Sequence, residues 1–311
     1  MQNILVTLNV LNYNTFDKTS LCIDSCLKQN GSFFRVLLID NCSTDDSYIK
    51  LREKYGNKID YLQTGNNYGY AKGNNLGVQF SLDSGCDYSF LLNSDTELIG
   101  NDLTKLLLRI MQKYDDCGIV SPLIYDVTSN GLLPVYNESF YVKLLRIFGV
   151  LPKNRRIDNT IETKSEAHGS ALFVDNKKFL ECGGFPEHYF MYAEESLFSK
   201  KILWSGANIY WLNDKCNYVL HHHDTSKSID SWRKFLMGRN ASLEYLENRK
   251  GKSRLWFMAF IIYVLRSLIS CASENKIVHI KGLIAGIKQY RRGLTKEELF
   301  DCGRQAKDII V

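Results

Sequence analysis

The chain has 311 residues, of which 45% are hydrophobic and 23% are charged. This length and apolar content exclude a disordered protein and allow one large domain or two small ones. The 9 cysteines are odd in number and scattered, with no CxxC pair, which is untypical of a disulfide framework. The first apolar run lacks the basic segment that precedes a secretion signal. We therefore expect a reduced, cytoplasmic compartment.

Charge is unevenly distributed along the chain. The net charge is +5, yet residues 226–311 carry 17 Lys and Arg against 8 Asp and Glu, so the preceding residues are net acidic. A basic C-terminal part predicts a phosphate-rich partner such as an anionic membrane face, although a solvated helical surface would carry the same charges. Because no nucleic-acid-binding motif accompanies these residues, we expect no nucleic acid partner.

The first hundred residues alternate apolar runs with helical patterns. Strands are predicted at 4–14, 34–43, 59–64 and 88–95, and helices near 17–29, 45–55 and 70–84. The strand runs are continuously apolar, as in parallel strands covered on both faces. This order predicts a doubly wound α/β domain, whose ligands bind beyond the carboxyl ends of the strands. Those ends are Asn12–Asn14, Asp40–Ser43 and Asn93–Asp95.

The rest of the chain divides into an irregular, a regular and a helical part. Residues 126–165 are polar, and we predict a loop region that shapes the acceptor side. Regular elements return as a strand at 170–175, a helix at 194–206 and strands near 208–212 and 217–220. Beyond about residue 228 the pattern is helical. We therefore expect a catalytic domain over 1–227 and a helical region over 228–311.

The run 255–270 is strongly apolar but contains Arg266. A membrane-spanning helix needs about 20 mostly apolar residues, so we do not expect this run to cross a bilayer. Trp256, Phe257 and the flanking basic residues fit a helix that lies in the membrane interface. A buried core helix or a contact with a partner helix would explain the run equally well.

Carboxylates at strand and helix ends are the first candidates for chemistry. Asp40 ends a predicted strand, where it can hydrogen-bond a ribose or a base. Asp95 follows another strand, where it could bind a divalent cation that neutralises a diphosphate. Glu194 and Glu195 begin a helix after an aromatic run. They either favour the helix dipole, or one of them is a general base whose pKa is raised by apolar surroundings.

Three consecutive histidines, His221–His223, suggest a metal site. Alternate residues of a strand share a face, which would pair His221 with His223, but no cysteine lies at zinc-motif spacing. We therefore expect one histidine to complete a metal shell with Asp95.

Two common nucleotide-binding motifs are missing. No glycine fingerprint follows the first strand, where Asn12–Thr15 stands instead, and no P-loop sequence occurs. These absences argue against a nicotinamide-dependent enzyme and against a P-loop nucleotidase.

Seven segments resemble, in order, the motifs of family 2 glycosyltransferases with the GT-A fold, nearest to the rhamnosyltransferase-like enzymes of bacterial surface-polysaccharide assembly. They are VTLNVLNYN (6–14), LLIDNCSTDDS (37–47), GNNYGYAKGNNLGV (65–78), LLNSDTEL (91–98), GSALFV (169–174), GGFPEHYFMYAEE (183–195) and GRNASLEYLENRKG (238–251). Each motif is common alone, but seven in the family's order make the resemblance specific. It implies a Rossmann-like, mostly parallel sheet with flanking helices, extended by C-terminal helices.

The resemblance also implies a nucleotide-sugar site. Asp40 would contact the base or ribose of a UDP- or dTDP-linked sugar. The same pocket would be lined by Asn12, Asn14, Asn67, Gly69, Asn74 and Asn93. The family's DXD motif falls on Asn93–Asp95, with Asn in place of the first acid. Asp95 would bind Mg2+ or Mn2+ together with His221, or with His223 in the alternative register.

The implied reaction is an inverting sugar transfer to a saccharide or lipid-linked saccharide acceptor, at the inner face of the cell membrane. Glu195 aligns with the family's catalytic base, and Glu194 precedes it. Leu197 stands where the family usually has a second Asp, so both glutamates stay candidates. A non-catalytic carbohydrate-binding relative or a nucleotide-sugar hydrolase on the same fold would share these motifs, and an oligomer is compatible with them.

Overall fold

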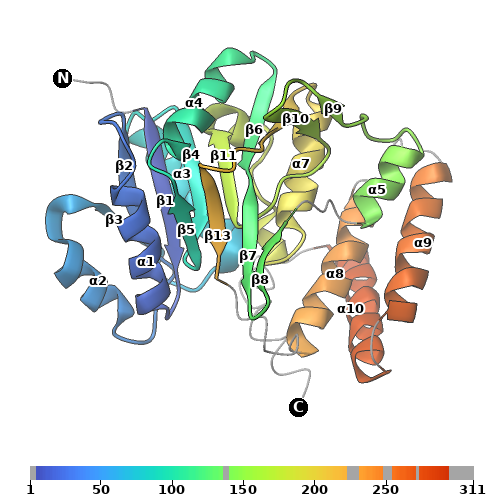
Figure 1. Cartoon of the computed structure of the whole chain (residues 1–311). Helices are drawn as coiled ribbons and strands as arrows, with labels where there is room; N and C mark the ends of the chain where they lie inside the picture. The colour runs from blue at the N-terminus through green and yellow to red at the C-terminus, as the bar shows by residue number, and fades with distance from the viewer. Residues whose placement is uncertain (1–4, 136–139, 223–230, 248–253, 271–272, 294–311) are drawn as a thin grey trace.

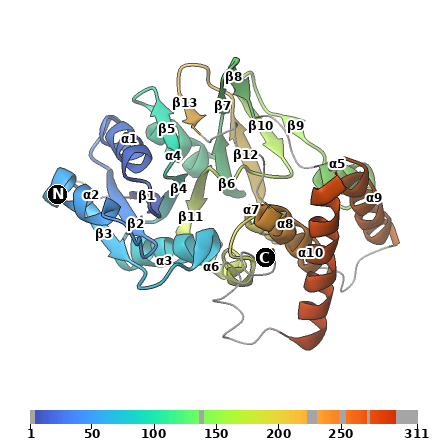
Figure 2. The same cartoon turned by 90° about the horizontal axis from the view of Figure 1, so that it is seen from below.

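The structure is a computed structural model, and it describes residues 5–135, 140–222, 231–247, 254–270 and 273–293. A central sheet with helices on both faces forms the larger part of the molecule (Figure 1). The helices α5 (Phe140–Ile147), α8 (Ser231–Glu247), α9 (Arg254–Ser270) and α10 (Ser273–Arg292) gather on one side of it (Figures 1 and 2).

The first half forms the predicted parallel strands. β1 (Val6–Asn12) lies between β2 (Phe34–Asp40) and β4 (Tyr88–Asn93), and β3 (Asp60–Gln63) extends the sheet beyond β2. The connecting helices are α1 (Phe16–Leu27), α2 (Ser47–Tyr55) and α3 (Gly69–Asp83). Asn12 is in register with Asp40, and Leu11 with Asn93. Three of the predicted site residues, Asn12, Asp40 and Asn93, therefore reach the same edge of the sheet.

Both faces of the sheet are covered by apolar helix faces, which explains why its strands are continuously apolar. One core contains side chains of α1, α2 and α4 (Leu103–Lys113), packed on Leu8, Phe90 and their neighbours. The other core contains side chains of α3, α6 (Asn176–Glu181) and α7 (Glu194–Trp204), packed on strand residues such as Leu91.

Within the described residues the main sheet has the order β3-β2-β1-β4-β11-β6-β12-β10-β9. β11 (Ala171–Asp175) is antiparallel to β4 and to β6 (Cys117–Pro122), while β12 (Asn208–Leu212) is parallel to β6. Because β11 runs against β4, residues that lead into β11 lie beside the carboxyl end of β4.

A smaller sheet begins with the strand that follows β4 in the chain. Its order is β5 (Thr96–Ile99), β13 (Tyr218–His221), β7 (Ile124–Thr128) and β8 (Gly131–Pro134). β13 is antiparallel to β5 and parallel to β7, so His221 is in register with both Thr96 and Asp126. This pairing brings residues 95, 126 and 221 together from three separate parts of the chain.

The prediction of an irregular loop over 126–165 is wrong for its described residues. They form the β7–β8 hairpin, the helix α5 and the pairing of β9 (Arg155–Arg156) with β10 (Ile161–Lys164). β8 and β9 are exposed along their whole length, so they have no buried apolar face to reveal them. Sequence patterns detect strands mainly through such a face.

The helical C-terminal region is held together by close packing. α8 and α10 approach through Gly238, Gly282 and Gly286, and a Cβ at Gly282 would lie 2.1 Å from the carbonyl oxygen of Phe235. α9 packs Ala259 against Val142 and Leu145 of α5. No helix in the described part of the chain combines the length and apolarity needed to cross a membrane. The division into 1–227 and 228–311 stays a prediction.

Candidate active site

The side chains of Asp40 and Asn12 meet at the edge of the sheet, and both are buried. Asn12 Nδ2 donates to Asp40 Oδ1 at 2.9 Å and to Ser43 Oγ at 3.0 Å. The other carboxylate oxygen of Asp40 accepts the backbone N–H of Ser43 at 3.1 Å. These bonds fix the orientation of a buried carboxylate at the place where α/β sheets bind their ligands.

Asn14 shapes the same edge from an exposed position. Its backbone is left-handed, with φ of 55°, which asparagine tolerates better than most residues. Asn14 Oδ1 accepts the backbone N–H of Thr44 at 2.8 Å, and its own backbone N–H donates to Ser43 Oγ at 3.0 Å. The loop after β1 therefore holds the loop after β2.

Asn67 and Gly69 lie at the start of α3, where they are connected to the end of β2 by Asn41. Asn41 Nδ2 donates at 3.0 Å both to Asn67 Oδ1 and to the carbonyl oxygen of Gly69. Asn74 lies one turn further along α3. Its Nδ2 donates to the carbonyl oxygen of Tyr70, while its buried Oδ1 has no hydrogen-bond partner in the described chain. Asn41 lies within the motif at 37–47 but was not among the predicted site residues.

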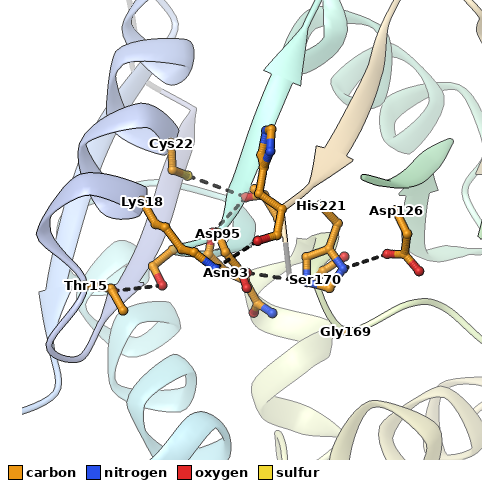
Figure 3. A network of polar contacts seen from close by, with 12 residues as sticks. Thr15, Lys18, Cys22, Asn93, Asp95, Asp126, Gly169, Ser170 and His221 are labelled. Carbon is orange, nitrogen blue, oxygen red and sulfur yellow. Dashed lines mark hydrogen bonds and ion pairs between the residues drawn. The ribbon is translucent and has the colours of Figure 1, made fainter. Parts of the chain in front are cut away.

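His221 lies between two carboxylates (Figure 3). Its Nε2 is 3.4 Å from Asp95 Oδ1, and its Nδ1 is 2.9 Å from Asp126 Oδ1. Burial opposes a charge on the ring, but the two carboxylates outweigh it and raise the pKa of His221 to about 9. Burial would raise the pKa of Asp95, yet His221 and Lys18 together lower it below its ordinary value.

This group of donors fits a divalent cation only in part. No cluster of three or more His, Cys, Asp or Glu side chains suited to a metal ion occurs among the residues that the structure describes. Asp95 and His221 nevertheless offer an oxygen and a nitrogen that face each other. Asp126 takes the place of the carboxylate that commonly orients a metal-binding histidine. Mg2+ is typically held by one or two carboxylates plus substrate phosphates, and Asp95 supplies one such carboxylate.

The structure describes only one of the two histidines that were predicted as alternative metal ligands. His221 lies beside Asp95, and the binding of a metal by this pair stays a prediction. His223, the alternative, lies outside the described residues. Asp126 was missed because it falls in the polar segment that gave no strand pattern.

Thr15 and Asn93 connect this group to the neighbouring parts of the site. Thr15 Oγ1 donates to Asn12 Oδ1 at 3.1 Å and lies 3.2 Å from Ser94 Oγ. On the other side, the backbone N–H of Asn93 donates to the carbonyl oxygen of Ser170 at 3.0 Å. Figure 3 shows Thr15, Asn93 and Ser170 around Asp95.

Glu194 and Glu195 begin α7 beside Gly169. A Cβ at Gly169 would lie 3.3 Å from Glu195 Cδ, so the glycine gives this carboxyl group its space. The chain continues from Gly169 to Ser170, which is bonded to Asn93. The acid pair is therefore adjacent to the Asn93–Asp95 turn.

The two glutamates differ in exposure. Glu194 is 4% exposed and its Oε2 is buried with no hydrogen-bond partner in the described chain, whereas Glu195 is only partly buried. Burial raises the pKa of Glu195 to about 7. Burial, reinforced by the charge of Glu195, raises the pKa of Glu194 well above its ordinary value. The hydroxyl of Tyr70 donates to the carbonyl oxygen of Gly169 beside the acid pair, and Tyr70 was not among the predicted site residues.

The glycosyl transferase family 2 domain matches residues 8–183, and the chain belongs to this family. It is 30% identical over 215 residues to the low-salt glycan biosynthesis hexosyltransferase Agl10 of Haloferax volcanii, covering 67% of this chain and 66% of that protein. It is 26% identical over 264 residues to the N-acetylglucosaminyl-diphospho-decaprenol L-rhamnosyltransferase of Mycobacterium tuberculosis, covering 77% of this chain and 82% of that one.

A solved structure of similar fold is that of GalNAc-T7 with UDP, GalNAc and Mn2+. It superimposes with a TM-score of 0.62 at 14% sequence identity, over 94% of this chain and 57% of that chain. The likeness confirms the predicted GT-A-like α/β fold with additional C-terminal helices. This chain spans slightly less than two thirds of the archaeal relative and little more than half of the solved chain.

Proposed function

We propose that this protein transfers a sugar from a nucleoside diphosphate to a saccharide acceptor, with inversion at the anomeric carbon. The observation that carries this proposal is the position of Glu195. A partly exposed carboxyl group with a pKa of about 7 lies beside the turn that bears Asp95, and Asp95 faces His221. Family membership supports the same reaction class.

The donor side is built from Asp40 and Asn12. Their fixed, buried side chains would recognise the ribose or pyrimidine base of a UDP- or dTDP-linked sugar. Asp95 and His221 would hold Mg2+ or Mn2+, a cation that neutralises diphosphate charge when bound. Because a histidine binds a metal only in its neutral form, His221 would give up its Nε2 proton when the cation binds. Asp126 fixes the ring of His221 through Nδ1.

On the acceptor side, Glu195 is the better candidate for the base. It would accept the proton of an acceptor hydroxyl while that oxygen bonds to the anomeric carbon and the bond to the departing diphosphate breaks. A pKa near 7 suits a base that must be deprotonated at neutral pH yet basic enough to take a proton. Glu194 is more deeply buried, so an acceptor hydroxyl would reach it less readily.

Matched variants test this assignment. Glu195→Gln should lower the rate of transfer about 10²–10⁴-fold, which is the usual contribution of a general base. Calorimetric binding of UDP or dTDP with Mn2+ should stay within a few-fold of the unmodified protein. Glu53→Gln, on the exposed surface of α2, serves as control. Full transfer by Glu195→Gln together with an inactive Glu194→Gln would move the base to Glu194. Release of free sugar without acceptor transfer would indicate a hydrolase.

The acceptor is proposed to be lipid-linked and approached at the inner face of the cell membrane. Along α9, Met258, Leu265 and Ile269 are exposed, with Ile269 at 81%. Arg254 and the exposed Lys and Arg residues of α10 add positive charge. Arg266, the charge inside the apolar run, lies 4.0 Å above the ring of Phe140 and so is accommodated by a cation–π contact. Apolar and basic side chains together favour an anionic bilayer surface.

Vesicle co-sedimentation tests the membrane contact. We expect binding to phosphatidylglycerol-containing vesicles at low salt and release at high salt. Leu265→Glu should weaken binding, while Ile49→Glu, at an exposed position of α2, should not. Equal binding of both variants, or no binding to anionic vesicles at low salt, would overturn this part of the proposal.

A further inference from the structure

The segment 188–193, which leads directly into Glu194 and Glu195, has an unfavourable backbone. Phe190, Tyr192 and Ala193 all have positive φ, at 65°, 74° and 68°. Residues other than Gly and Asn rarely adopt this region, and each one that does carries backbone strain. A backbone of this kind persists only where its surroundings hold it in place.

Asn240 of α8 holds this segment from one side. Its side chain is completely buried. Its Nδ2 atom faces three backbone carbonyl oxygens, those of Tyr192 at 2.7 Å, Met191 at 2.9 Å and Tyr189 at 3.2 Å. Its Oδ1 accepts a bond from Arg239 Nε at 3.0 Å. A side-chain amide is well suited to this place because its nitrogen carries two N–H donors and its oxygen is an acceptor.

Arg239 and α3 complete the support. The Nη2 atom of Arg239, which is also buried, donates to the carbonyl oxygens of His188 and Tyr189. From the opposite side, the backbone N–H of Ala71 donates to the carbonyl oxygen of Phe190 at 3.2 Å. A Cβ at Gly69 would lie 2.3 Å from that same oxygen, so the glycine allows the approach.

We propose that Asn240, supported by Arg239, is a positioning residue: its amide holds segment 188–193 in its left-handed conformation and thereby aims Glu195 at the acceptor hydroxyl. This inference rests on the proposed role of Glu195 as the base. It gives α8 a part in the reaction, although α8 follows the region that the family domain matches. A displacement of reacting groups by about 1 Å can lower a rate 10²-fold. A small shift of Glu195 would therefore cause a measurable loss in the rate of transfer.

The test compares Asn240→Leu and Asn240→Asp with a matched control. Leucine keeps the size but removes the donors, and aspartate presents a carboxylate to three carbonyl oxygens. Asn176→Leu removes another fully buried amide, which donates to the carbonyl oxygen of Cys86 far from the acid pair. We expect both Asn240 variants to lose about 10²-fold in kcat with little change in KM for the donor, and the midpoint of their pH–rate profile to move. Asn176→Leu should lose stability but keep kcat and the midpoint.

A folded Asn240→Leu protein with unchanged kcat and unchanged pH midpoint would overturn the inference. If neither Asn240 variant folds, Arg239→Lys provides the measurement, because it keeps the buried charge but removes the fork of donors. It should lower kcat in the same direction by a smaller factor, and an unchanged kcat would count against the proposal. The Glu195→Gln variant distinguishes a failure of the positioning role of Asn240 from a failure of the proposed role of Glu195 as base. If that variant is inactive while the Asn240 variants are active, only the positioning role fails. If it is active, the proposed base itself is wrong.

Discussion

Lys200 of α7 and Glu244 of α8 form an ion pair that is almost completely excluded from solvent, with Lys200 at 0% and Glu244 at 4% exposure. Lys200 Nζ also donates to Ser196 Oγ at 2.8 Å. The pair joins the helix that carries Glu195 to the helix that carries Asn240. The helix α8 is thus anchored to the candidate active site by buried charge as well as by hydrogen bonds.

Breaking this pair should be costly, whereas replacing it should not. Lys200→Met alone leaves a buried carboxylate unpaired and should lower the free energy of unfolding by about 3–5 kcal/mol. The double variant Lys200→Met/Glu244→Leu should recover most of that loss, because an apolar pair avoids the desolvation of both charges. Urea unfolding of the two singles and the double measures the coupling. Lys50→Met, which breaks the exposed pair with Asp46, should change little. A double variant as unstable as the sum of the singles would show that the two charges do not compensate each other.

The rate of transfer should rise with pH through about 7 and then level off, because Glu195 must lose its proton to act as base. The charged or titratable groups around it are Glu194, Glu166, Glu244, Lys200 and Tyr70. The much lower rate that remains in Glu195→Gln should lack this pH dependence. A pH–rate profile measured with saturating donor provides the check. A rate that is flat between pH 5 and 8 would contradict the assignment.

The same pKa makes a prediction about stability. A carboxyl group whose pKa is raised in the folded state stabilises the fold while it is protonated, and this contribution is lost as pH rises through the folded-state pKa. Glu195→Gln should therefore be more stable than the unmodified protein at pH 8, and this advantage should disappear near pH 4. Thermal unfolding at both pH values measures the difference. An advantage that is equal at the two pH values would have another cause.

Asp126 should matter for metal affinity although it is not a proposed ligand. Asp126→Asn removes the carboxylate that orients His221, and loss of such a partner typically costs 10–100-fold in metal affinity. Titration of Mn2+ in the presence of UDP, followed by electron paramagnetic resonance, gives the dissociation constant. Asp83→Asn, at an exposed position of α3, is the control. Unchanged affinity in Asp126→Asn would remove Asp126 from the site.

The close crossing of α8 and α10 predicts an unusual sign for a glycine substitution. At an exposed position inside a helix, a Gly→Ala substitution stabilises the protein by about 1 kcal/mol. A Cβ at Gly286 would lie 2.3 Å from the carbonyl oxygen of Arg239, so Gly286→Ala should instead cost about 1–3 kcal/mol. Chemical denaturation measures the change, with Lys281→Ala on the exposed side of α10 as control. A stabilised Gly286→Ala protein would mean that the helices can separate at no cost.

Much of the fold could be predicted because each strand of the first half can be recognised from its own sequence. The strands that end at Asn12, Asp40 and Asn93 are buried on both faces, and their continuous apolar runs follow from that. The strand ends then locate the donor side of the site. The smaller sheet was less visible, since β8 is exposed throughout. The helix α4 was not assigned either, although its buried side chains recur with helical spacing.

The parts of the site that were missed depend on contacts between distant segments. Asp126 reaches His221 only because β7 pairs with β13, and the sequence of neither strand specifies that partner. The left-handed residues Phe190 and Ala193 are of types that give no warning of positive φ, since glycine or asparagine usually marks such positions. Asn240 lies within a quoted motif, but its role appears only when α8 is placed against segment 188–193.

The central claim is that a nucleoside diphosphate sugar binds beside Glu195 through a cation held by Asp95 and His221. A thermal-shift screen of UDP- and dTDP-sugars, with and without Mn2+, tests it most directly. A ligand present at 100 times its Kd adds about 2.7 kcal/mol to the stability of the folded state, which is readily detected. We predict a shift with one such sugar that requires Mn2+ and is lost in Asp95→Ala. A shift that is equal with and without Mn2+, or that persists in Asp95→Ala, would contradict the account.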